Sequence, residues 1–138
     1  MGLILDANVL WSYIDRRQPR HTDCVRLIDD CDEDVLIPTP VLAEVDYFIS
    51  QRLHPGILLA LLDAVENAQF ALVDVESEDL PRISSLVSQY AGSDVGFVDA
   101  AVLAIVERLN EPKLATLDRR HFGMMRPRHI EALTLLPE

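Results

Sequence analysis

Short apolar runs alternate along the chain with longer stretches in which apolar residues recur at helical spacing. The runs have the length of strands, and the stretches between them have the length of helices. The pattern predicts strands at 3–5, 35–37, 70–75, 114–117 and 133–136, and helices at 8–16, 21–31, 39–53, 57–67, 77–91 and 97–109. Continuous apolar strands that alternate with helices are typical of a parallel sheet covered on both faces. We therefore expect an α/β fold.

Two acidic residues follow directly on apolar runs. Asp6 ends the run Leu3–Leu5, and Asp118 ends the run Leu114–Leu117. Ligands of open parallel α/β sheets gather at the carboxyl ends of the strands. If the two strands are neighbours, both carboxylates belong on that edge of the sheet.

Two further acidic residues interrupt the apolar faces of predicted helices. An α-helix turns about 100° per residue, and on this wheel Glu44 falls between Tyr47 and Phe48, within the apolar arc of its helix. Asp99 likewise falls within the apolar arc of the helix predicted at 97–109. Asp46 lies on the opposite, polar side, as a solvated acid should. Glu44 and Asp99 can therefore lean over the same sheet edge from early turns of their helices.

Four acidic residues in apolar surroundings need a positive partner, because burial of a lone carboxylate is costly. The chain has a single lysine, Lys113, and no cation recurs beside all four acids. A divalent metal ion would meet the need, which points to metal-assisted hydrolysis of phosphate esters. Each acid also has an ordinary interpretation, as a helix N-cap, a turn residue or a short reach to solvent. All four ordinary interpretations must hold together, so we favour the metal site.

The formal net charge of −11 argues against a nucleic-acid partner, but the arginines are unevenly distributed. One group follows the first strand, and a second group follows Asp118. The residues that we single out as candidate RNA contacts are Arg16, Arg17, Arg119, Arg120 and His121. The alternative is that these cations lie on solvated faces or compensate helix dipoles.

With 138 residues the chain is long enough to build a core, and we expect one domain over residues 1–138. It shows no secretory signal pattern and no apolar run near the roughly 20 residues of a membrane span. Cys24 and Cys31 lie about 10 Å apart along one predicted helix and cannot pair there. Two free thiols fit a reducing compartment, so we expect a cytoplasmic protein that does not bind membranes.

Four segments of the chain together resemble the signatures of a PIN domain. They are Leu3–Asn8, Val41–Glu44, Gly96–Ala101 and Thr116–Phe122. Each segment alone is a weak signal, but all four occur in the right order and on the right types of element. Their arrangement is most similar to the VapC-type toxins of toxin–antitoxin pairs.

This resemblance implies a single PIN-like, Rossmann-like α/β/α sandwich with a mainly parallel sheet of about four to five strands. It also implies an endoribonuclease that depends on Mg²⁺, or on Mn²⁺ in its place. The implied catalytic and metal-binding quartet is Asp6, Glu44, Asp99 and Asp118. Asn8 is expected to orient Asp6, and Thr116 to do the same near Asp118.

The resemblance further implies partners. The expected ones are a structured RNA substrate (ribosomal or transfer RNA), a cognate VapB-type antitoxin and a second copy of the chain in a homodimer. A catalytically silent PIN module that only binds RNA or protein is the alternative, although no member of the quartet is missing. Receiver domains and phosphatases that begin with Asp-x-Asp fit less well, because Ala7 and Asn8 follow Asp6 and no lysine follows Lys113.

Overall fold

The computed structural model describes every residue from Met1 to Glu138 and contains two sets of parallel strands. Three strands pair in the order β1 (Gly2–Ile4), β2 (Asp34–Pro38) and β3 (Ala71–Val73). A second pair consists of β4 (Lys113–Ala115) and β5 (Thr134–Leu136).

The two sets of strands meet at β1 and β4. Leu5 forms a parallel bridge with Ala115, and the Asp6 backbone N–H donates to the Ala115 carbonyl at 2.8 Å. The strands therefore follow one another in the order β3-β2-β1-β4-β5, all parallel. This order makes the carboxyl ends of β1 and β4 direct neighbours, which meets the condition under which Asp6 and Asp118 share one edge of the sheet.

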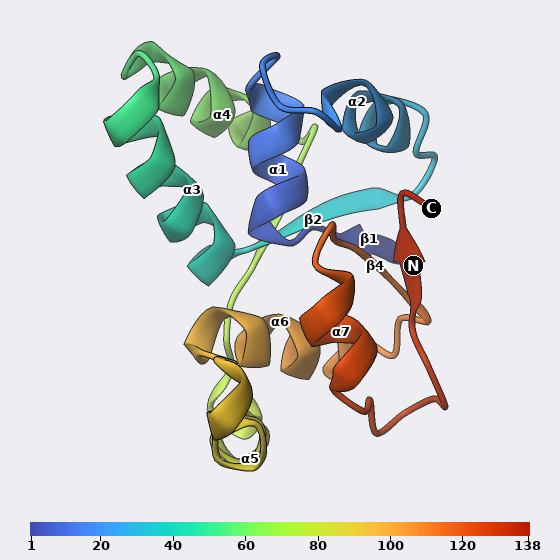
Figure 1. Cartoon of the computed structure of the whole chain (residues 1–138). Coiled ribbons are helices and arrows are strands. Elements are labelled where there is room, and N and C mark those ends of the chain that lie inside the picture. Colours follow the sequence, from blue (N-terminus) through green and yellow to red (C-terminus); the bar gives the residue numbers. More distant parts are fainter.

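Helices cover both faces of these strands. They are α1 (Ala7–Ile14), α2 (His21–Asp29), α3 (Thr39–Arg52), α4 (Gly56–Glu66), α5 (Leu80–Gln89), α6 (Phe97–Arg108) and α7 (Arg119–Met124), with the 3-10 turns η1 (Ser77–Asp79) and η2 (Ala91–Ser93). Figure 1 shows α1, α2 and α4 on one side of the strands and α5, α6 and α7 on the other. The expected α/β/α sandwich with a parallel sheet is confirmed.

Burial in the core explains the apolar runs of β1 and of the middle of α6. Leu3, Ile4 and Leu5 are fully buried between the two helical layers, which accounts for their unbroken apolar run. Every residue of α6 from Ala100 to Val106 is buried as well. Burial of a large aliphatic side chain contributes about 1.5–3 kcal/mol, so these two elements anchor the sheet edge to which Asp6 and Asp99 belong.

Several predicted element boundaries differ from the structure. The strand predicted at 114–117 ends at Ala115, so Asp118 lies in the turn beyond β4 rather than next to its last residue. The helix predicted at 77–91 begins as the 3-10 turn η1 and ends at Gln89. The pattern missed α7, which has only six residues and a single buried one, Phe122. No helix has the length and apolar character that a bilayer crossing needs.

Candidate active site

Asp6 and Thr116 face each other across the adjoining ends of β1 and β4. The Thr116 hydroxyl, which is fully buried, donates to Asp6 Oδ2 at 2.7 Å. The Thr116 hydroxyl oxygen in turn accepts the Asp118 backbone N–H at 3.0 Å. Asn8 completes the link, because its side-chain oxygen accepts the Leu117 N–H at 2.9 Å and its amide donates to Asp6 Oδ2 at 3.3 Å. These bonds fix the Asp6 carboxylate and the turn that carries Asp118.

Asp6 also has a structural role as the N-cap of α1. Its Oδ1 accepts the Ala7 backbone N–H at 2.8 Å, and its own backbone is extended. The cap occupies Oδ1, while Oδ2 faces the hydroxyl of Thr116. The ordinary interpretation of Asp6 as a helix cap is therefore correct, and it holds together with a place in the cleft described next.

The four predicted acids line one cleft of about 380 Å³. α1, α3, α6 and α7 surround the region where β1 and β4 end (Figure 1). The residues that line the cleft are Asp6, Ala7, Asn8, Trp11, Gln18, Glu44, Phe48, Arg52, Asp99 and Asp118. Residues far apart in the sequence, from both helical layers, thus bring their carboxylates to the same space.

Burial and mutual repulsion raise the pKa of three of these carboxyls. The pKa of Asp6, which is only 4% exposed, rises from 3.8 to about 6, mainly through burial and further through the charges of Asp99 and Glu44. The pKa of Glu44 is raised by burial and by the charge of Asp99. The pKa of Asp99 is raised by burial, an effect that the nearby His121 opposes. The protein alone therefore does not balance the negative charge of the cleft.

His121 is hydrogen-bonded to Asp118, and both of its ring nitrogens face protein acceptors. Nδ1 lies 2.7 Å from Asp118 Oδ2, and Nε2 lies 2.7 Å from the Ser93 carbonyl. The His121 backbone N–H donates to Asp118 Oδ1 at 2.9 Å. A carbonyl only accepts, so Nε2 carries a proton, and the bond to Asp118 raises the pKa of His121. Both ring nitrogens of His121 thus face protein oxygens, and the RNA contact that we predicted for His121 stays a prediction.

A hard divalent cation suits the donors gathered here. Carboxylate oxygens are the ligands that Mg²⁺ and Mn²⁺ prefer. Asp99, Asp118 and His121 each offer one potential ligand atom, and these atoms lie within 4.8 Å of one another. The raised pKa of Asp6 indicates a carboxylate that gains from added positive charge. The side chains present therefore fit a divalent metal ion.

The arginines predicted to contact RNA lie outside the cleft. Arg17 is 67% exposed and pairs with Asp15 at 3.0 Å. Arg119 donates to the Pro137 carbonyl at 2.8 Å, while Arg16 and Arg120 are exposed. The structure does not place these four side chains among the cleft residues.

The sequence pattern missed several residues of the cleft wall. Arg52, Gln18, Trp11 and Phe48 line it beside the acids. One signal for two of them was present in the chain: Glu44, Phe48 and Arg52 are spaced four residues apart, which places them along one face of α3.

Comparison with known proteins agrees with this geometry. The protein has a parallel α/β sheet with a carboxylate cleft at the carboxyl edge of its strands. This combination makes metal-dependent phosphoesterases the candidate class for the protein. The family model for the PIN domain matches residues 3–124, and the chain belongs to this family.

Individual relatives cover nearly the whole chain. Ribonuclease VapC26 of Mycobacterium tuberculosis (strain ATCC 25618 / H37Rv) is 27% identical over 135 residues, which are 98% of this chain and 100% of the relative. The crystal structure of Mycobacterium tuberculosis VapC20, a toxin that cleaves the sarcin–ricin loop, has a TM-score of 0.79 at 14% identity, over 88% of this chain and 93% of that one. VapBC2 of Rickettsia felis, solved with a DNA fragment from its promoter, has a TM-score of 0.72 at 18% identity, over 98% of both chains.

Proposed function

We propose that this PIN-domain protein is the toxin of a toxin–antitoxin pair and acts as an endoribonuclease that depends on Mg²⁺ or Mn²⁺. The observation that carries the proposal is the meeting of Asp6, Glu44, Asp99 and Asp118 in one cleft. The likeness to ribonuclease VapC26 supports RNA as the substrate. The fold of VapC20, whose own target is the sarcin–ricin loop, favours ribosomal RNA as the substrate class, with transfer RNA as the alternative.

In this proposal the protein supplies ligands and positioning. Asp6 and Asp99 are the direct metal ligands, and Glu44 and Asp118 complete the site. A bound divalent ion supplies an activated water and stabilises negative charge on the phosphoryl oxygens.

The supporting residues hold these carboxylates in place. Thr116 and Asn8 hold Oδ2 of Asp6, and His121 holds both oxygens of Asp118. Outside the cleft, the exposed cations Arg16, Arg17, Arg119 and Arg120 bind flanking phosphates of the RNA.

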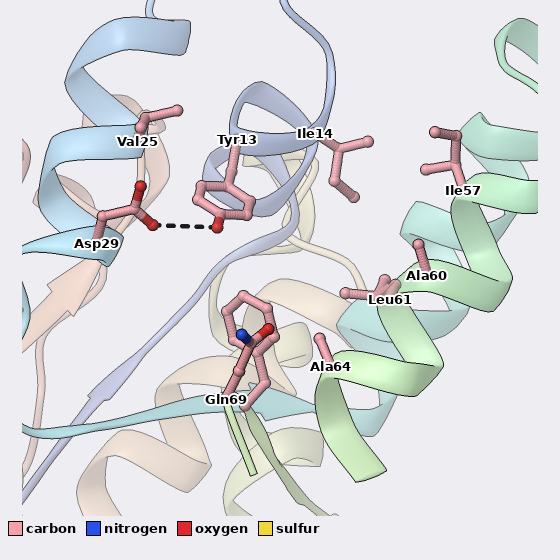
Figure 2. A pocket seen from close by; sticks show the side chains of 10 residues that line it. Tyr13, Ile14, Val25, Asp29, Ile57, Ala60, Leu61, Ala64 and Gln69 are labelled. Carbon is pink, nitrogen blue, oxygen red and sulfur yellow. Dashed lines mark hydrogen bonds between the residues drawn. The ribbon is translucent and has the colours of Figure 1, made fainter. Parts of the chain in front are cut away.

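The antitoxin needs a surface of its own. An apolar groove of about 430 Å³ lies between α1, α2 and α4, and Figure 2 shows Ile14 from α1 and Leu61 from α4 directed toward it. We propose that an amphipathic segment of the antitoxin docks there and that an arginine of its tail enters the acidic cleft. Leu10 and Trp11 of α1 are buried in the core and do not line this groove. The toxin is proposed to act as a homodimer in the cytoplasm.

The test is RNA cleavage by the purified protein. We expect cleavage of ribosomal or transfer RNA in Mg²⁺ or Mn²⁺ and none in excess EDTA, with the cut site identified by sequencing of the new 5′ ends. Retained RNA binding without any metal-dependent cleavage would favour the silent binding module instead.

A further inference from the structure

We infer that α3 carries a nucleotide-binding subsite beside the four carboxylates, in which Phe48 stacks on a base and Arg52 binds a phosphate next to the cleaved one. The inference rests on the proposed ribonuclease function and adds to it the residues that recognise the substrate strand. Neither residue belongs to the acidic quartet or to the arginines outside the cleft.

The first argument is the order of side chains along α3. Glu44, Phe48 and Arg52 follow one another at four-residue intervals, so they share one helix face at steps of about 6 Å. All three line the same cleft. An acid, a ring and a cation thus form a row that begins at the proposed metal site. Arg52 lies about 12 Å along the helix from Glu44, at a distance suited to a neighbouring phosphate rather than the attacked one.

The second argument is that the Arg52 guanidinium is free. It is exposed and forms no ion pair, although four carboxylates line the same cleft. By contrast, Arg82 and Arg108 are each held by a buried or half-buried carboxylate, from Glu107 and Asp79. A planar guanidinium with unused donors matches the geometry of a phosphate diester.

The third argument is the apolar wall between these two charges. Phe48 is half-buried, and its ring centroid lies 5.5 Å from that of Trp11, which lines the cleft as well. An aromatic face beside a cation is the usual platform for a single-stranded base, and such stacking accepts any base. The wall therefore suits a base splayed out of the RNA rather than a paired stem.

Both residues also have ordinary interpretations. Phe48 packs against the core, and Arg52 lies in the last turn of α3, where a cation compensates the helix dipole. A dipole partner can point in any direction around the helix axis. Core packing and dipole compensation do not require Phe48 and Arg52 to lie in the same cleft as the four carboxylates, whereas a nucleotide-binding subsite does.

Trp11 is the only tryptophan of the chain, so its fluorescence reports on this cleft directly. The experiment is a titration of the full-length protein with a short single-stranded oligoribonucleotide in Mg²⁺. Stopped-flow fluorescence records the binding of each concentration before cleavage proceeds. We expect a saturable fluorescence change in the wild type. Phe48→Leu and Arg52→Gln should each weaken binding about tenfold, by loss of stacking and of a charged hydrogen bond.

Two matched variants serve as controls. Tyr47→Leu removes the neighbouring ring on α3, which is 62% exposed and lies outside the cleft. Arg26→Gln removes an exposed arginine on α2 that lines no part of the cleft. Both should bind as the wild type does, and the thermal midpoints of all four variants establish that they fold.

Unchanged affinity in Phe48→Leu and Arg52→Gln, or the absence of a saturable signal in the wild type, would overturn the subsite. Because the titration measures binding alone, it separates the two proposals. A protein that binds with the expected variant pattern but cleaves no RNA in any divalent metal supports the subsite and contradicts the ribonuclease. A protein that cleaves RNA equally well with and without Phe48 and Arg52, and binds it equally, contradicts the subsite alone.

Discussion

Asp6 is the most buried carboxyl of the quartet, and its environment makes the metal-free fold sensitive to pH. Its pKa rises from 3.8 to about 6 on folding. The folded protein therefore holds a proton on Asp6 more tightly than the unfolded chain does, and this stabilises the fold below about pH 4. The stabilisation is lost as the pH rises through about 6. At about 1.4 kcal/mol for each pKa unit, the loss in the free energy of unfolding amounts to about 3 kcal/mol.

Asp6→Asn should therefore stabilise the metal-free protein near neutral pH. The amide carries no charge, so the variant should gain up to about 3 kcal/mol over the wild type at about pH 7 and much less at about pH 4. Urea unfolding in EDTA at the two pH values measures the difference. An equal difference in stability between the variant and the wild type at both pH values would show that the buried charge of Asp6 does not destabilise the fold. Because the Asp6 charge also repels Asp99 and Glu44, part of the gain comes from relief of that repulsion.

Thr116 connects Asp6 to the turn of Asp118 through one hydroxyl, and Thr116→Val removes that link at nearly constant volume. The change leaves the Asp118 N–H without its acceptor, at a cost of about 1–3 kcal/mol in the free energy of unfolding. It should also weaken Mn²⁺ binding about 10- to 100-fold, as the loss of a supporting hydrogen bond does in other metal sites. Calorimetric titration and urea unfolding check both effects.

Thr134→Val is the matched control for this change, because Thr134 is an exposed residue of β5. It should alter neither stability nor metal binding by a measurable amount. If both valine variants behave alike, the Thr116 hydroxyl does not position the site.

The apolar pattern pointed to individual cleft residues where a polar side chain interrupts it, and the PIN resemblance added Asn8 and Thr116. Glu44 and Asp99 could be found because each interrupts an apolar helical arc, and Asp6 because it ends an apolar run. Arg52 and Gln18 occupy ordinary polar positions, and nothing in the one-dimensional pattern shows that they face the cleft. The contact of His121 with Ser93 joins residues 28 positions apart, so it depends on how η2 and α7 meet in space.

At the scale of elements, a half-buried ion pair joins α5, α6 and the segment after α7. Arg82 on α5 donates to both oxygens of Glu107 on α6, at 2.8 and 2.9 Å. It also donates to the Arg126 carbonyl, and Glu107 accepts the backbone N–H of Arg128. This cluster holds α6, which carries Asp99, against the C-terminal segment that follows α7.

Arg82→Ala should therefore destabilise the protein by about 3 kcal/mol, since it removes the cation from Glu107, whose side chain is only 10% exposed in the native structure. Thermal or urea unfolding measures the loss. The contrasting variant is Arg20→Ala, which breaks an ion pair with Asp23 whose side chains are 38% and 47% exposed, and which should cost less than about 1 kcal/mol. Equal costs for the two pairs would contradict the structural role given to Arg82.

The order and type of the long elements could be predicted because their periodicity is strong. α3 and α6 were expected at 39–53 and 97–109 and lie at Thr39–Arg52 and Phe97–Arg108. α7 could not be predicted, because its six residues show too little apolar periodicity and its start depends on the Asp118 cap. The pairing of β1 with β4 joins segments more than 100 residues apart. The sequence did not predict this pairing, and the shared edge of Asp6 and Asp118 was expected only if it occurred.

At the scale of the whole molecule, the acidic cleft and the apolar groove share α1 but have different chemistry. If the antitoxin docks in the groove as proposed, its binding can be disturbed there without any change to the acids. Ala60→Glu introduces a charge at an exposed position that lines the groove (Figure 2). It should prevent co-purification with the cognate antitoxin and relieve inhibition of the ribonuclease.

Leu59→Glu is the neighbouring control on α4, because Leu59 is 68% exposed and lies outside the groove. Its complex with the antitoxin should form normally. If Ala60→Glu binds the antitoxin as tightly as Leu59→Glu does, the partner docks elsewhere on the molecule.

The most direct test of the account is the rate of RNA cleavage by Asp99→Asn. Asp99 is a proposed metal ligand at the first turn of α6, and its loss should lower the rate in Mg²⁺ or Mn²⁺ by at least about 1000-fold while the protein stays folded. Asp46→Asn, which removes a solvent-exposed acid of α3, should cleave at the wild-type rate. Wild-type cleavage by Asp99→Asn in a folded protein would contradict the claim that the four carboxylates form one catalytic metal site.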